Sequence, residues 1–248
     1  MASETRDFPY YNGQPVLISG RQWLIVMAAI VCGYVVLTAR LPFFATRFGQ
    51  FVPAILFFAI PLAALAAVTP QHWTAVFRKL RIRDVMWMIL FALLNIVASM
   101  SIGLAVWALT TTAANPVVGA VGGMASGDLL FFFLKTIPQL FGEEVLTVLP
   151  FLALMYVLHT RMQMSRTQAI VGAWLIAAML FGAAHLPTYN WNWVQCFVVI
   201  GGARLVLLLP YMLTKNIWVS TGAHILNDWM LLGFTLLGPY LLKAGAAS

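Results

Sequence analysis

The chain has 248 residues, of which 62% are hydrophobic and only 8% are charged, and its mean hydropathy is +0.91. These values exclude an ordinary soluble domain and indicate a polytopic membrane protein. The net charge is +7, but no arginine-rich face with interleaved aromatic residues indicates a nucleic-acid partner. We therefore expect one all-α domain, a bundle of transmembrane helices whose partner is the lipid bilayer.

Seven apolar runs are long enough to span a bilayer. They lie at about 22–39, 50–69, 85–111, 128–157, 168–187, 193–213 and 217–240. We therefore divide the chain into a cytoplasmic N-terminal segment 1–21, a single transmembrane domain 22–240 and a short tail 241–248. The N-terminal segment lacks the basic and apolar regions of a signal peptide, so the first span is expected to be an uncleaved anchor.

The distribution of basic residues predicts the orientation of these spans. With the N-terminus inside, nine basic residues fall in cytoplasmic segments: Arg6, Arg21, Arg78, Lys79, Arg81, Arg83, Arg161, Arg166 and Lys215. Three fall outside: Arg40, Arg47 and Lys243. Because cytoplasmic loops of membrane proteins carry an excess of Lys and Arg, this asymmetry places the N-terminus inside and the C-terminus outside.

Two connecting segments allow more than one interpretation. Residues 72–84 place Trp73 and Phe77 at helical spacing among several basic residues, which fits a short amphipathic interfacial helix as well as a basic loop. Residues 115–127 contain glycines spaced by four residues. That spacing allows a re-entrant piece with close helix packing, but clustered Gly with Pro is more typical of a flexible outer loop.

Two adjacent acids, Glu143 and Glu144, lie in the middle of the fourth run. They are about fifteen residues from either end of that run, near the bilayer midplane at about 1.5 Å per residue. A carboxylate at this depth costs about 2.5–3.5 kcal/mol on insertion scales. An acidic pair placed there therefore indicates a functional site with a polar cavity inside the bundle.

Two other spans carry polar groups. His185 lies near the end of the run 168–187, whose helix is expected to end at Leu186, before Pro187. A lone histidine near a helix end is more often a hydrogen-bonded interfacial residue than a catalyst. His224, Asn227 and Asp228 project from one helix face at positions i, i+3 and i+4. They could be interhelical hydrogen-bond contacts, but together with the two acids they favour water activation. The sequence has no GxSxG or HExxH motif beside them, so hydrolysis by activated water is favoured over an acyl-enzyme.

In their order along the chain, these motifs resemble the CAAX protease and bacteriocin-processing (CPBP) family of intramembrane proteases, which includes the type II CAAX prenyl endopeptidases. The family pattern is EExxxR, then FxxxH, then HxxxN or HxxxD, each on a different helix, and residues 128–229 follow it. The resemblance implies an intramembrane endopeptidase whose substrate is a small peptide or a membrane-associated protein. A bacterial inner membrane is the simplest location.

The resemblance also implies a role for each polar residue of the motifs. The implied catalytic residues are Glu143, Glu144, His185, His224, and Asn227 or Asp228. Glu143 is expected to activate water with support from Glu144, and His185 to position that water. His224 and one of its two polar neighbours are expected to stabilise the oxyanion. Zinc held by Glu143, His185 and His224 is the alternative, since zinc usually takes three protein ligands and an open position. Water activation without an obligatory metal is favoured.

One departure from the family pattern matters for the function. Val148 stands where the family has Arg, four residues after Glu144. We predict that Arg204, inside the sixth span, supplies the missing positive charge to Glu144. Without such a charge, a non-catalytic scaffold or bacteriocin-immunity protein of the same fold becomes the alternative. A proton-coupled transporter is a further alternative, because Glu and His at mid-depth also form proton relays.

Overall fold

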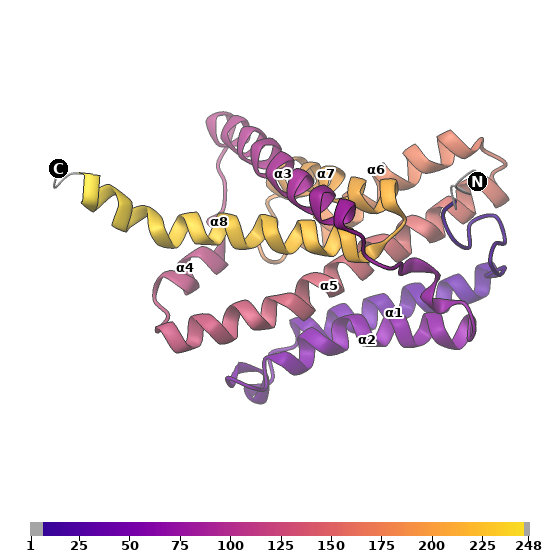
Figure 1. The fold of residues 1–248 in the computed structure, drawn as a ribbon, viewed down its shortest axis with the longest axis horizontal. Coiled ribbons are helices and arrows are strands. Elements are labelled where there is room, and N and C mark those ends of the chain that lie inside the picture. Colours follow the sequence, from indigo (N-terminus) through magenta and orange to yellow (C-terminus); the bar gives the residue numbers. More distant parts are fainter. Residues whose placement is uncertain (1–6, 246–248) are drawn as a thin grey trace.

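The computed structural model describes the backbone of residues 7–245 and the side chains of residues 7–237. Every regular element in this part of the chain is helical (Figure 1). The α-helices are α1 Gly20–Thr38, α2 Phe51–Val68, α3 Ile82–Leu109, α4 Pro116–Gly122, α5 Ser126–Tyr156, α6 Arg166–Ala184, α7 Gly201–Thr214 and α8 Ile217–Gly245. Short 3-10 turns cover Pro42–Ala45 and Trp73–Val76, and π-helical turns cover Val157–Arg161 and Gln195–Ile200.

Six helical stretches among the described residues are long and apolar enough to cross a membrane. They are α1, α2, α3, Ser126–Arg161, α6 and Gln195–Thr214. The prediction of a transmembrane helical bundle is therefore confirmed. The seventh run expected from the sequence, 217–240, falls on α8, which is not among these six.

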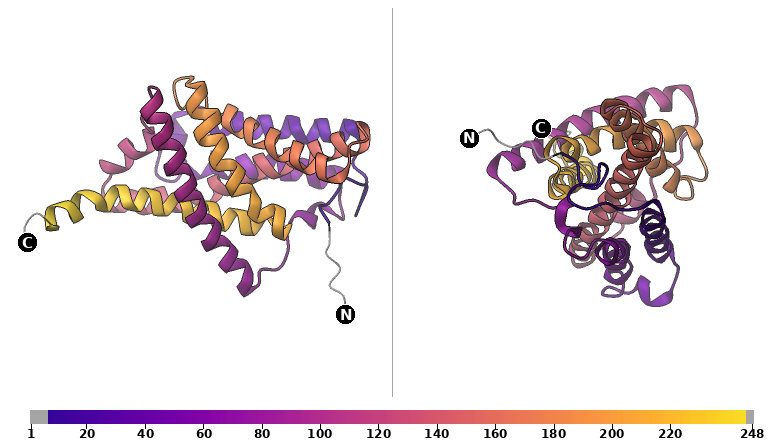
Figure 2. Two further views of the ribbon diagram at one scale, coloured as in Figure 1. Left: turned by 90° about the horizontal axis from the view of Figure 1, so that it is seen from above. Right: turned by 90° about the vertical axis from the view of Figure 1, so that its right-hand side faces the viewer.

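Helix α5 forms the centre of the bundle. In its most apolar window 78% of the residues are buried, against 22–39% in the other five candidate spans. It packs against α2, α6 and α8, while α1 and α2 lie side by side along one flank (Figure 1). Figure 2 shows α3 crossing α8 obliquely on another flank. The buried position of α5 explains how it can hold polar groups away from lipid.

Close packing of α1 on α2 depends on a glycine. A Cβ atom at Gly33 would lie 2.7 Å from the carbonyl oxygen of Phe57, which no side chain tolerates without a shift of the backbone. The α1–α2 pair therefore packs tightly, as expected where small residues face a neighbouring helix in a membrane.

The connection from α2 to α3 contradicts the interfacial helix considered for residues 72–84. After the 3-10 turn at Trp73–Val76 the chain runs without helix until α3 begins at Ile82. Asn216 holds this stretch, because its Oδ1 accepts from the Arg78 N–H at 3.1 Å and its Nδ2 donates to the Arg78 carbonyl at 3.2 Å. These two bonds occupy backbone groups that a helix would need, so the basic-loop alternative is the better description.

Residues 115–127 contain more structure than the flexible loop we favoured. Asn115 caps α4 by accepting from the Val117 N–H at 2.9 Å, and Pro116 occupies the first helical position. Val121 is buried against Phe132 of α5 and Leu232 of α8. The glycines of this segment are therefore compatible with a short helix that is fixed by its cap and by one buried apolar side chain.

Candidate active site

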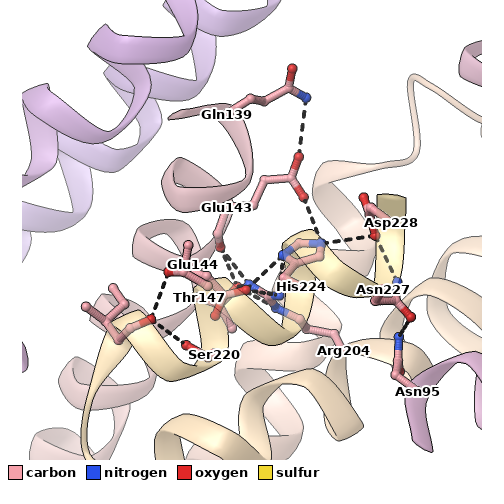
Figure 3. A network of polar contacts seen from close by, with 12 residues as sticks. Asn95, Gln139, Glu143, Glu144, Thr147, Arg204, Ser220, His224, Asn227 and Asp228 are labelled. Atoms are coloured by element: carbon pink, nitrogen blue, oxygen red, sulfur yellow. Dashed lines mark hydrogen bonds and ion pairs between the residues drawn. The ribbon is translucent and has the colours of Figure 1, made fainter. Parts of the chain in front are cut away.

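Glu143 and Glu144 project from the middle of α5 in different directions, since consecutive helical residues are about 100° apart. The Glu144 side chain is fully buried, whereas the Glu143 side chain is 13% exposed. Gln139, one turn earlier on α5, donates to Glu143 Oε1 at 3.4 Å (Figure 3). The two acids therefore occupy different environments although they are neighbours in sequence.

Arg204 of α7 lies against Glu144, as the sequence analysis predicted. Its Nη1 donates to Glu144 Oε1 at 2.6 Å, and neither side chain is exposed. Its Nε and Nη2 donate to Thr147 Oγ1 at 2.8 and 2.6 Å, and Nη2 also donates to the Glu143 carbonyl at 2.7 Å. The guanidinium also lies 4.2 Å from the centre of the Phe181 ring, within the range of a cation–π contact. The arginine that α5 lacks at Val148 is thus replaced from another helix.

His224 of α8 joins the two acids. Its Nδ1 lies 2.9 Å from Glu144 Oε1. Nδ1 also lies 3.3 Å from Arg204 Nη1, which can only donate, but its shorter contact is with a carboxylate that can only accept, so we assign the proton to Nδ1. Nε2 then faces Glu143 Oε2 at 3.8 Å and Asp228 Oδ1 at 3.7 Å. These separations exceed a direct hydrogen bond but can be bridged by one water molecule or a substrate atom.

Asn227 and Asp228 differ in what they contact. Asn227 is buried, accepts from Asn95 Nδ2 of α3 at 3.0 Å and donates to Asp228 Oδ1 at 2.9 Å (Figure 3). Asp228 is only partly buried and lies beside Nε2 of His224. The side chain one turn after His224 is therefore the one nearer the imidazole, while its neighbour ties α8 to α3.

A cavity of about 700 Å³ reaches Glu143 from the end of the bundle where α1 connects to α2. His185, the C-cap residue of α6, lines this cavity together with Glu143. Its Nδ1 lies 2.8 Å from the Phe181 carbonyl, which can only accept, so Nε2 is left with its lone pair. The Phe181 ring packs against both His185 and His224, with centroid distances of 4.6 and 6.4 Å. His185 thus shares the cavity but stands apart from the hydrogen-bonded group around Glu144.

The segment that carries these side chains, residues 125–230, matches a family model described as type II CAAX prenyl endopeptidase Rce1-like. These residues form an Rce1-like domain. The resemblance to the CPBP family is thereby confirmed, and the family and the apolar helices together identify an integral membrane protein. Comparisons of the chain with curated proteins and with solved structures give no match.

The Rce1-like domain does not assemble the zinc ligands considered from the sequence. Among the described residues, no three His, Cys, Asp or Glu side chains are grouped closely enough to hold a metal ion. Nδ1 of His224 is bound to Glu144, and Nδ1 of His185 is bound to the Phe181 carbonyl. Since the arrangement does not fit a three-ligand zinc site, we assign no step of the reaction to a metal.

Four residues of the site escaped the sequence analysis. Thr147 could have been found, because it lies one turn from both acids on α5. Asn95 and Gln139 are single amides within spans, each without a motif of its own. Tyr34 of α1 lines the cavity and donates through its hydroxyl to the Ala184 carbonyl at 2.5 Å, a contact between distant helices that only the fold brings about.

Proposed function

We propose that this protein is an intramembrane endopeptidase that cuts a membrane-associated protein or a small peptide with water activated by Glu143. The Rce1-like domain supports a protease. The observation that carries the assignment is the unequal setting of the two acids. Glu144 is buried and committed to Arg204 and His224, whereas Glu143 lines the cavity. A general base must reach the proton that it removes, and Glu143 is placed to do so.

In the proposed reaction, Glu143 takes a proton from water as the water oxygen attacks the substrate carbonyl carbon. His185, with its Nε2 lone pair, accepts a hydrogen bond from that water and orients it. His224 is oriented by Glu144 through Nδ1; as an imidazolium that carries a second proton on Nε2 throughout the cycle, it donates a hydrogen bond to the oxyanion. When the C–N bond breaks, Glu143 returns its proton to the leaving amine, and the products are a carboxylic acid, which keeps the second proton of the water, and an amine; that acid proton then passes to the amine, giving a carboxylate and an ammonium group.

The ion pair between Arg204 and Glu144 weakens the case for a non-catalytic scaffold. That alternative depended on the absence of a counter-charge at Val148, and Arg204 supplies the charge from α7. With this charge in place, Glu144 can stay ionised inside the bundle and keep His224 in one orientation. The buried polar group therefore supports a working site.

Cleavage of a membrane-peptide library by purified protein in detergent tests the proposal. Glu143→Gln keeps the shape of the side chain but removes the base, so we expect cleavage to fall by about 10²–10⁴-fold, the usual contribution of a general base. Gln71→Ala, a change at an exposed residue of the α2–α3 connection that does not line this cavity, is the control and should retain cleavage.

The same assay with a zinc chelator separates the two chemistries. If cleavage persists with the chelator but is lost in Glu143→Gln, the glutamate activates water without a metal. If cleavage is lost in both cases, the site is that of a metal enzyme. If the wild-type protein cleaves no peptide that the Glu143→Gln variant leaves intact, the protease assignment is wrong. The scaffold and transporter alternatives then take its place.

A further inference from the structure

The two ends of the bundle differ in charge. The basic end consists of the connections α2–α3, α5–α6 and α7–α8 and the start of α1, and it carries Arg21, Arg78, Lys79, Arg81, Arg83, Arg161, Arg166 and Lys215. The opposite end, where α1 connects to α2 and α6 ends, carries Arg40 and Arg47 among its described side chains. By the positive-inside rule the basic end faces the cytoplasm.

Residues 7–18 close the basic end of the bundle. Phe8 packs on Phe151 of α5 with ring centroids 5.2 Å apart, and Tyr10 donates to the His72 carbonyl at 2.6 Å. Tyr11 accepts from Thr160 Oγ1 at 2.8 Å through its carbonyl. This segment therefore bridges the α2–α3 and α5–α6 connections and covers the core beneath them.

The interior between this segment and the site is filled. Between Glu144 and the basic end, α5 contributes Val148, Leu149, Phe151 and Leu152, and all four side chains are fully buried. A cavity of about 580 Å³ at the basic end is lined by the N-terminal segment and the α2–α3 connection, and none of the site residues lines it. Access to Glu143 from the cytoplasmic face is therefore blocked by packed side chains.

A polar path leads from Glu143 to the opposite end. Lys135, Gln139 and Glu143 are spaced by four residues on one face of α5, and all three line the 700 Å³ cavity. Lys135 Nζ donates to Gln139 Oε1 at 2.7 Å, and Gln139 donates on to Glu143. The cavity continues past Thr38 to Arg40 in the α1–α2 connection. Polar groups thus line the route from the bundle end to the acid.

We propose that the site receives its substrate from the outer face of the membrane, through the cavity between the α1–α2 connection and α5, while residues 7–18 seal the cytoplasmic face. The nature of the substrate, a peptide segment presented at the outer face, rests on the proposed function. The direction of access rests on the cavity, the packed core and the charge distribution.

Labelling of single cysteines from either side tests the direction without any assay of activity. In a Cys32→Ser background, with Cys196 left buried, Thr38→Cys and Ala45→Cys mark the cavity, and Gln71→Cys is the matched control at the basic end. The probe is a membrane-impermeant maleimide added to sealed membrane vesicles. We expect the two cavity cysteines to react in right-side-out vesicles and Gln71→Cys to react in inside-out vesicles.

A water-soluble peptide that the purified protein cleaves provides the second measurement. We expect right-side-out vesicles to cleave it and inside-out vesicles to spare it, with Glu143→Gln as the blank. Reversed labelling, or cleavage confined to inside-out vesicles, overturns the outer access and leaves the protease intact. If the labelling is as expected but the purified protein cleaves no peptide that Glu143→Gln leaves intact, the direction of access stands and the proposed function is wrong.

Discussion

Arg204 connects several parts of the site through one guanidinium, so its loss should affect stability strongly. It bonds Glu144, Thr147 and the carbonyl of Glu143, and neither its own side chain nor that of Glu144 is exposed to solvent. Arg204→Leu would leave the Glu144 carboxylate buried without its counter-charge. We expect the free energy of unfolding to fall by about 3–5 kcal/mol, as for other buried pairs broken on one side. Denaturant unfolding in detergent measures this change.

An exposed ion pair on the same molecule provides the control for Arg204→Leu. Arg47 binds Asp128 at 2.7 Å, but both side chains are about half exposed, at 53% and 50%. Arg47→Leu should therefore change the free energy of unfolding by about 0–1 kcal/mol. Equal effects of the two substitutions would show that the Arg204 contacts contribute no more than a surface pair.

Asn227 and Asp228 should respond differently to substitution. Asn227 bonds Asn95 on another helix, so Asn227→Ala should lower stability by about 0.6–1.7 kcal/mol, the range of interhelical hydrogen bonds in membranes. Asp228 lies beside His224 Nε2, so Asp228→Asn should lower kcat with a smaller effect on unfolding. Thermal unfolding and peptide cleavage of both variants decide the matter. Loss of kcat in Asn227→Ala alone would reverse the roles.

The sequence was sufficient to predict the pairing of Arg204 with Glu144, and insufficient to predict the neutral partners in the site. An arginine inside a span must pair with an acid, so Arg204 could be assigned to Glu144 although they lie on different helices. Asn95 need not pair with one particular type of residue, because an amide in a membrane helix can form hydrogen bonds with many partners. Its contact with Asn227 depends on how α3 crosses α8, which no spacing in the sequence encodes.

At the scale of helices, a glycine sets how α6 meets the segment that follows it. A Cβ atom at Gly182 would lie 2.5 Å from the carbonyl oxygen of Cys196, which belongs to the π-helical turn before α7. Gly182→Ala would push α6 away from this turn and displace His185 three residues later. We expect a loss of about 1–3 kcal/mol in stability, as for other overpacked cores. The measurement is the unfolding midpoint in detergent, followed by cleavage activity.

Gly119 of α4 provides the matched control. A Cβ atom there meets nothing within 4 Å, and the residue is exposed in a helix. Gly119→Ala should therefore leave stability unchanged or raise it by about 0.5–1 kcal/mol, because Ala loses less backbone entropy than Gly in a helix. A similar loss for both substitutions would mean that the close contact with Cys196 does not decide the effect at Gly182.

Helix ends were harder to predict than helices. The fifth run was expected to end at Leu186, before Pro187, but α6 ends at Ala184 and His185 is its cap. The proline marks where a helix cannot continue, while the actual end lies earlier because the chain turns there, with Thr188 and Tyr189 bonding back to the His185 carbonyl. This difference bears on the site, since the cap position aims His185 into the cavity.

For the whole molecule, residues 7–18 tie separate helices together at the basic end. Asp7 accepts from Arg166 Nη2 at 2.6 Å and from Nε at 3.0 Å, and Lys215 Nζ lies 4.8 Å above the Phe8 ring. Burial alone would raise the pKa of Asp7, but the hydrogen bonds from Arg166 and Tyr11 outweigh it and lower the pKa to about 2. The N-terminal segment is therefore held by the ionised form of Asp7, which binds a proton less readily in the folded protein than in the unfolded chain.

This low pKa predicts how stability depends on pH. Since an unfolded Asp has a pKa of about 3.9, the unfolded chain takes up the proton first, and the stabilisation by Asp7 is complete above about pH 5 and lost as the pH falls towards 2. Wild type should therefore unfold at a higher temperature than Asp7→Asn at neutral pH, and the gap should close between about pH 5 and 2. Asp128→Asn, at an exposed ion pair, is the control and should show little gap at neutral pH. If the gap for Asp7→Asn stayed constant down to the lowest pH at which the protein folds, the ion pair with Arg166 would not be what holds the N-terminal segment against the bundle.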